Sequence, residues 1–365
     1  MLKHPVNQLL FSVFIISFQF LPGILWAQNK DLPNKSFEVS ILENSMFTTD
    51  KFWRGADGAA TIDLENGKIL WLFSDTFIDT RGTGRRAGSK MINNTIAIQN
   101  GNDLQNDRLD FFWKGTAKKP RAFFELPGKT WFWTGHGTVV NGKLLIFLFE
   151  EKASEEGLGF ESVGWTLAII DNPDDSPENW QIKYVKGPET FGVIVGSSAV
   201  LKEGDFVYAF GVKEPGSHET YLLRFKKESI SNGDLSGMEW WMGDRWESDV
   251  AEEPKSAALF KSQTEFSVHF DTTLNKYIQI QTLGFGYSSL AFRLSTHLQG
   301  PWSEPVVFYT PQLSKNEFNY TANAHPELNA DGILVTYNVN NFKFDELVKN
   351  EGIYFPRLIV LKLIK

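Results

Sequence analysis

A hairpin pattern recurs five times along this 365-residue sequence, and this repeat constrains the fold more than any other feature. Each copy begins with small or polar residues, turns at an Asn-Gly or similar pair, and continues as a more apolar strand. Asn-Gly supplies the positive φ that a tight hairpin requires. The copies start near residues 56, 135, 195, 264 and 323, about 60 to 80 residues apart, which is typical of propeller blades.

The repeat predicts an all-β, five-bladed propeller that forms one domain over residues 28–365. Strand-like runs at 95–99, 164–170, 220–225 and 288–294 follow four of the hairpins, as third strands of blades should. Segments 36–42 and 357–364 are expected to pair and close the ring, and only short pieces such as 344–349 are expected to be helical. A two-sheet sandwich is the alternative, and five repeats favour the propeller.

The first residues indicate export. Residues 9–25 form an apolar core, and Ala27 supplies a small residue at the expected cleavage point, which is the anatomy of a signal peptide. A membrane anchor is the alternative, but Gln19 and Pro22 interrupt the run before the ~20 apolar residues of a span. We expect a signal peptide over 1–27, a periplasmic or extracellular protein, and no membrane span after cleavage.

The composition of the chain limits the classes of molecule that the protein is expected to bind. The net charge of −8 argues against nucleic acid and anionic membrane surfaces. The absence of cysteine rules out disulfides and a thiol nucleophile. Aromatic residues make up 14% of the chain, enough for a propeller core or for sugar-stacking platforms. For Trp53, Trp131 and Trp133, blade packing is favoured over sugar stacking.

Polar residues fall where the blades should meet one rim. The first strand of a blade lines the central channel, so its beginning lies beside the end of the antiparallel second strand. The predicted beginnings carry Asp57, His136, Ser197, Ser198, Glu265, His325 and Glu327. The predicted ends carry Asp75, Glu150, Gln281, Thr282, Asn338 and Asn340. The pattern predicts a polar funnel suited to a sugar.

Three carboxylates in this funnel are predicted to be catalytic. Asp57 and Asp75 should lie on adjacent strands, and two close carboxylates push their pKa values apart, as glycoside hydrolysis requires. Glu265 at a strand start is a candidate general acid. The structural alternatives are a turn cap for Asp75 and a solvated strand end for Glu265.

A second group is predicted to bind substrate hydroxyls. Its members are polar residues placed near the same rim: Arg54, Asn93, Asn94, His136, His325, Glu327 and Asn338. For the histidines, the alternative is a buried, hydrogen-bonded side chain beside the channel. Oxygen ligands around a channel would suit calcium, but no spaced ligand motif supports a metal, so no cofactor is predicted.

These motifs resemble a bacterial family catalogued as a domain of unknown function and related to endo-D-arabinanases. The resemblance runs from about Phe47 to the C-terminus and rests on Asp57-Gly58, residues 71–77 (Trp-Leu-Phe-Ser-Asp-Thr-Phe), Asn93-Asn94, 265–268 (Glu-Phe-Ser-Val), 300–303 (Gly-Pro-Trp-Ser), 324–328 (Ala-His-Pro-Glu-Leu) and 336–338 (Thr-Tyr-Asn). More widely, the chain is similar to five-bladed propeller arabinanases and fructosidases, which implies a base or nucleophile at the position of Asp57.

The sequence departs from that wider pattern in blades two and three, whose predicted starts carry no carboxylate. Glu265 in blade four would then be the general acid, unless Asp75 takes part of that role. We expect a monomeric glycoside hydrolase acting on a furanose-containing polysaccharide such as arabinan. The alternatives are a non-catalytic glycan-binding propeller and a scaffold for protein partners of the cell envelope.

Overall fold

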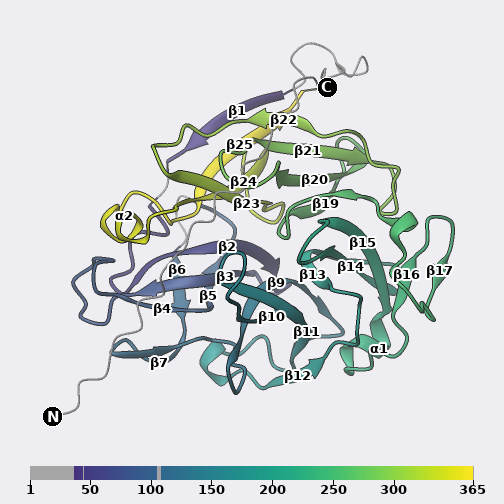
Figure 1. Cartoon of the computed structure of the whole chain (residues 1–365), viewed down its shortest axis with the longest axis horizontal. Helices are drawn as coiled ribbons and strands as arrows, with labels where there is room; N and C mark the ends of the chain where they lie inside the picture. The colour runs from purple at the N-terminus through teal and green to yellow at the C-terminus, as the bar shows by residue number, and fades with distance from the viewer. Residues whose placement is uncertain (1–36, 44, 105–107, 365) are drawn as a thin grey trace.

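The computed structural model describes residues 37–43, 45–104 and 108–364. The predicted signal peptide, 1–27, lies outside these residues. The described chain folds as a single all-β domain with five sheets arranged as propeller blades (Figure 1). This arrangement confirms the predicted fold class. No helix within the described ranges is long and apolar enough to cross a membrane.

The blades follow one another along the chain, and each is an antiparallel meander. Blade one contains β2 (Trp53–Asp63), β3 (Lys68–Ile78), β5 (Thr95–Asn100) and β6 (Leu109–Phe112), with β4 (Lys90–Ile92) beside β3. Blade two contains β9 (Thr130–Val140), β10 (Lys143–Ala153), β11 (Phe160–Ile170) and β12 (Ile182–Lys186). Blade three contains β13 (Val193–Glu203), β14 (Phe206–Lys213), β15 (Glu219–Lys226), β16 (Glu239–Trp241) and β17 (Trp246–Glu247), with β18 (Phe260–Lys261) beside β15.

The last two blades complete the ring. Blade four contains β19 (Ser267–Asp271), β20 (Lys276–Thr282), β21 (Leu290–Ser295) and β22 (Val306–Tyr309). Blade five contains β23 (Glu317–Ala324), β24 (Ile333–Asn341), β25 (Arg357–Leu363) and β1 (Phe37–Leu42). Outside the blades lie a small hairpin and two short helices: β7 (Lys114–Thr116), β8 (Lys119–Arg121), α1 (Lys227–Ser231) and α2 (Phe344–Lys349).

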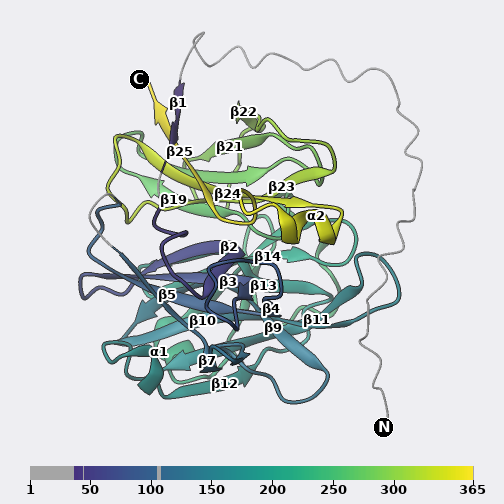
Figure 2. The ribbon, with the colours of Figure 1, turned by 90° about the vertical axis from the view of Figure 1, so that its left-hand side faces the viewer.

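Two sets of contacts close the ring. The inner strands β2, β9, β13, β19 and β23 contact one another in that order, and β23 returns to β2. At the outside of blade five, β1 pairs antiparallel with β25 from Phe37↔Leu363 to Leu42↔Leu358. Figures 1 and 2 both show β1 in purple alongside β25 in yellow. The predicted closure is therefore confirmed, as is the short helix at 344–349.

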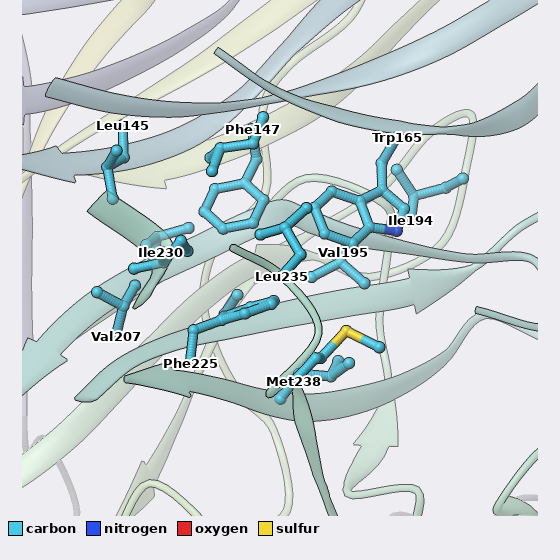
Figure 3. Close-up of a cluster of buried hydrophobic side chains, with 14 of the residues drawn as sticks. Leu145, Phe147, Trp165, Ile194, Val195, Val207, Phe225, Ile230, Leu235 and Met238 are labelled. Carbon is cyan, nitrogen blue, oxygen red and sulfur yellow. The ribbon is translucent and has the colours of Figure 1, made fainter. Parts of the chain in front are cut away.

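Apolar side chains between neighbouring blades form the core. Between blades two and three, Phe147 stacks on Trp165 with ring centroids 5.7 Å apart, and Ile194, Val195 and Phe225 are buried around them (Figure 3). Burial of one such aromatic side chain is worth about 3–5 kcal/mol against its truncation to Ala. Since no disulfide exists in this chain, this packing holds the blades together.

Four of the inner strands are longer and less regular than the hairpin pattern predicts, whereas β19 is short. β9 begins at Thr130 and β23 at Glu317, so the predicted starts near 135 and 323 are wrong. Register shifts interrupt the pairing of β2 with β3, β9 with β10, β13 with β14 and β23 with β24. A bulge re-aims side chains toward one side of a strand. The bulges therefore decide which side chains reach the rim.

Candidate active site

Asp57 and Asp75 face one another across the β2–β3 pair. The register shifts between Ala56↔Thr76 and Gly58↔Phe73, and both aspartates fall within this irregular stretch. Both side chains are half-buried. The structure thus brings together the two carboxylates that the sequence predicted to be neighbours.

One oxygen of Asp57 is held by two phenols. Tyr320 donates to Asp57 Oδ2 at 2.7 Å, and Tyr354 donates to the same oxygen at 3.1 Å. Asp57 Oδ1 is buried and has no hydrogen-bond partner among the described residues. Burial raises the pKa of Asp57 to about 6, and the two phenol hydrogen bonds oppose that rise. One oxygen of Asp57 is therefore held by two hydrogen bonds, and the other oxygen bonds none of the described residues.

Asp75 is held by donors from two other segments. Trp133 Nε1 donates to Asp75 Oδ1 at 2.9 Å, and the Asn93 side chain also bonds this carboxylate. Burial raises the pKa of Asp75, and the neighbouring charge of Asp57 raises it further. Because Asp75 sits in this shared network, the turn-cap alternative does not describe its contacts.

Glu265 approaches the pair from blade four. It lies two residues before the start of β19, and its side chain is half-buried. A Cβ atom built on Gly58 would lie 3.7 Å from Glu265 Oε1, so this carboxyl reaches the residue next to Asp57. Burial and the charge of Asp57 raise the pKa of Glu265 to about 8. At neutral pH Glu265 therefore carries a proton beside an ionised Asp57.

The structure adds a fourth carboxyl that the sequence interpretation missed. Glu151 is fully buried; Ser162 donates to its Oε1, and its Oε2 has no partner in the part of the chain that the structure describes. Burial raises the pKa of Glu151 to about 8, with a further contribution from the charge of Asp75. The neighbouring Glu150, which we placed at the rim, instead binds Lys186 and Thr166.

The pairing of β10 with β11 shifts register between Glu150 and Glu151. A shift of this kind turns the side chain of Glu151, and not that of Glu150, toward the rim. A pair of adjacent glutamates at the end of a strand was the signal available in the sequence. Tyr320 and Tyr354 were missed for a different reason. Aromatic residues in strand-like runs are far more often core, and nothing local shows that these two hydroxyls meet Asp57.

Three predicted binding residues form contacts with other parts of the protein near Asp57 and Asp75, and not with these carboxylates. Arg54 forms an ion pair with Glu351 at 3.8 Å and lies over the Phe355 ring. Asn94 is fully buried and bonds the backbone of Phe124 and Phe132. Asn338, also buried, donates to the Ala56 carbonyl and accepts from Thr321. Asn338 therefore braces the strand that carries Asp57.

The remaining predicted binding residues lie deeper along the channel. His325 follows the last residue of β23 and is fully buried, with its ring nitrogens bonded to Thr61 and Thr336. Glu327 also bonds Thr61. Thr61 lies near the turn end of β2, so the predicted place of these residues at the strand beginning is wrong.

His136 is half-buried in the middle of β9 and accepts a hydrogen bond from the Val200 backbone N–H at 3.1 Å. Burial lowers the pKa of His136 to about 4 and that of His325 to about 3, so both rings are neutral at neutral pH. These contacts correspond to the alternative of hydrogen-bonded histidines beside the channel.

The described residues contain no group of three or more His, Asp or Glu side chains arranged to hold a metal ion. Phenol donors bond one oxygen of Asp57, and indole and amide donors bond the carboxylate of Asp75. What the arrangement can do chemically is transfer protons, since an ionised carboxylate and protonated carboxyls lie close together.

Residues 43–361 match a protein family described as "Domain of unknown function (DUF5005)". The chain belongs to this family. No curated protein matches the sequence. The matched range covers the inner strands of all five blades and every carboxyl described above, so the candidate site lies within the DUF5005 domain.

Two solved structures illustrate what the DUF5005 fold resembles. A protein of Bacteroides ovatus, provisionally named a hydrolase, aligns with a TM-score of 0.70 and 17% identity over 87% of this chain and 88% of that chain. A xylan β-1,4-xylosidase from Bacillus halodurans aligns with a TM-score of 0.50 and 11% identity over 87% of this chain and 54% of that chain. At these identities the likeness establishes the shared propeller fold.

Proposed function

We propose that this DUF5005 protein is a glycoside hydrolase that acts on a furanose-containing polysaccharide such as arabinan. The observation that carries the proposal is the pairing of Asp57 with Glu265. One oxygen of Asp57 is held by two tyrosines, and the other is unengaged. Glu265, whose pKa is raised to about 8, supplies the proton.

In the proposed reaction, Glu265 donates its proton to the oxygen of the glycosidic bond as that bond breaks. Asp57 Oδ1 either attacks the anomeric carbon or removes a proton from the water that attacks it. The charge of Asp57 raises the pKa of both Asp75 and Glu265, and Asp75 lies on β3 beside Asp57. The similarity in fold to a xylosidase and to a provisionally named hydrolase supports this chemistry as an analogy.

The test is release of oligosaccharides from a panel of plant and mycobacterial arabinans, with xylan included because of the fold similarity. We expect Asp57→Asn and Glu265→Gln to lose at least about 1,000-fold in kcat/KM, since each removes a proton-transfer group. The matched control is Asp110→Asn, an exposed carboxylate on β6, which should retain wild-type activity.

The second candidate function is a non-catalytic glycan-binding propeller. Wild-type protein that binds arabinan, releases no product from any glycan of the panel, and binds equally well after both site substitutions would replace the hydrolase with this function. Loss of release in the Asp110→Asn control would show that the site variants report folding and not catalysis.

We also propose that the protein is exported as a monomer, with residues 1–27 removed as a signal peptide. The apolar run at 9–25 followed by Ala27 supports cleavage before Gln28. Fractionation of expressing cells, with N-terminal sequencing of the mature chain and light scattering, tests both parts. A cytoplasmic chain that retains Met1 would contradict export.

A further inference from the structure

Three phenylalanine rings from separate segments meet beside the candidate site. Phe285 lies in the loop after β20, Phe318 near the start of β23, and Phe342 directly after β24. The Phe318 and Phe342 rings stack with centroids 4.5 Å apart, and Phe285 lies 5.0 Å from Phe318. We call these three residues the rim platform.

The rim platform consists of two exposed rings, Phe285 and Phe342, that rest on the buried ring of Phe318. Phe285 is 52% exposed and Phe342 47% exposed, which is unusual for rings that contact one another. The loop of Phe285 is tied to β23, because the Asn319 N–H donates to the Gly286 carbonyl and the Asn319 side chain accepts from the Ser288 N–H. Gly284 and Gly286 adopt φ of 82° and 103° on either side of Phe285, a backbone that only glycine adopts without strain.

The platform is continuous with the carboxylates. Its innermost ring, Phe318, lies 5.4 Å from the ring of Tyr320, whose hydroxyl donates to Asp57. A chain of ring contacts therefore links the exposed rings of the platform to Tyr320 and, through its hydroxyl, to Asp57.

A cleft of about 430 Å³ adjoins the Phe285 loop at Leu283 and Gly284. Its lining includes His218, Lys261, Gln263, Thr282, Gly284 and Arg293. Thr282 is fully buried, and its hydroxyl has no partner among the described residues. Because Thr282 has no exposed surface, the groups open to the cleft are the side chains of His218, Lys261 and Gln263, which can form hydrogen bonds with sugar hydroxyls.

We propose that the rim platform is a sugar-binding subsite for a residue of the same glycan chain that occupies the carboxylate pocket. A sugar ring presents C–H groups on its faces and hydroxyls on its edge, so an aromatic ring covers a face while a polar cleft bonds the edge. The consequence is a preference for chains of several sugars over short ones. This inference rests on the proposed function, because it assumes that the glycan chain is bound at the catalytic carboxylates.

Binding measurements test the subsite separately from catalysis. Calorimetry with the full mature chain carrying Asp57→Asn compares arabinohexaose with arabinobiose, and xylohexaose serves as a second probe. We expect Phe285→Ala to weaken hexasaccharide binding about tenfold and to leave disaccharide binding within about twofold, and Phe285→Trp to restore it.

The matched control is Phe270→Ala, an exposed ring of the same blade at the turn end of β19. It should bind both ligands as the parent does. The inference is overturned if Phe285→Ala binds the hexasaccharide as well as Phe270→Ala, or if the parent binds neither hexasaccharide. If hexasaccharide binding depends on Phe285 but the protein hydrolyses no glycan, the subsite is supported and only the proposed hydrolase activity is contradicted.

Discussion

At the scale of single residues, the state of Asp57 depends on side chains that come from blade five. Tyr320 and Tyr354 both donate to its Oδ2, although they are distant in sequence. The pKa of each tyrosine is raised well above its usual value by burial and then by the charge of Asp57, so both hydroxyls remain donors at neutral pH. These donors stabilise the ionised form of Asp57 against the cost of burial.

Removing one donor should therefore shift the pH dependence of activity. With Asp57 ionised above about pH 6 and Glu265 protonated below about pH 8, kcat/KM should follow a bell between these values. Tyr320→Phe should move the acidic limb upward by about one pH unit, since a hydrogen bond to a charged group is worth about 1.5–3 kcal/mol.

The control for Tyr320→Phe is Tyr184→Phe, in the outer strand of blade two, which should leave both limbs in place. An unchanged acidic limb in Tyr320→Phe would show that Asp57 is not the group titrating there. A shift of the alkaline limb alone would show that Tyr320 affects the pKa of Glu265 and not that of Asp57.

At the scale of elements, a buried arginine ties blade one to blade five. Arg86 has no exposed surface and donates to the carbonyls of Arg54, Leu347, Asn350 and Ile353. Its guanidinium also lies over three aromatic rings, including Tyr354 at 5.7 Å. Arg86 thus holds the segment between α2 and β25 that carries Tyr354 to Asp57.

Arg86→Met should lower the free energy of unfolding by about 3–5 kcal/mol, because it leaves several buried carbonyls without a donor. Urea denaturation measures this loss. The adjacent Arg85 is exposed, so Arg85→Met should change stability by less than about 0.5 kcal/mol. Equal effects of the two substitutions would contradict the role assigned to Arg86.

At the scale of the whole molecule, the rim carboxyls make stability depend on pH. Burial raises the pKa of Glu151 and Glu265 to about 8, above the ordinary value of about 4.3. Between those pH values the folded protein retains protons that the unfolded chain has released. The free energy of unfolding should therefore fall as pH rises from about 4 to 8.

Glu265→Gln should flatten this dependence and raise the free energy of unfolding at pH 8 relative to wild type by on the order of 1 kcal/mol or more, which raises Tm. Calorimetric scans at pH 5 and pH 8 measure both effects. Glu178→Gln, at an exposed glutamate of blade two, is the control and should keep the wild-type slope. A Glu265→Gln protein with that same slope would contradict the buried, protonated state of Glu265.

The sequence by itself determined the number of blades, the closure of the ring by its two ends, and the neighbouring placement of Asp57 and Asp75. Turn residues and strand alternation are local, so they can be read along the chain, and a hairpin with few residues between its strands sets its own partners. Glu265 was also placed correctly, because it precedes the first strand of its blade.

Only the tertiary structure decided how deep each side chain lies in the channel. Bulges shift the register of four inner strands, so His325 and Glu327 fall near the turn end and Glu151 replaces Glu150 at the rim. Tyr320, Tyr354 and Arg86 act through partners in other blades. Such contacts depend on how the blades pack around the ring, and no spacing along the chain encodes them.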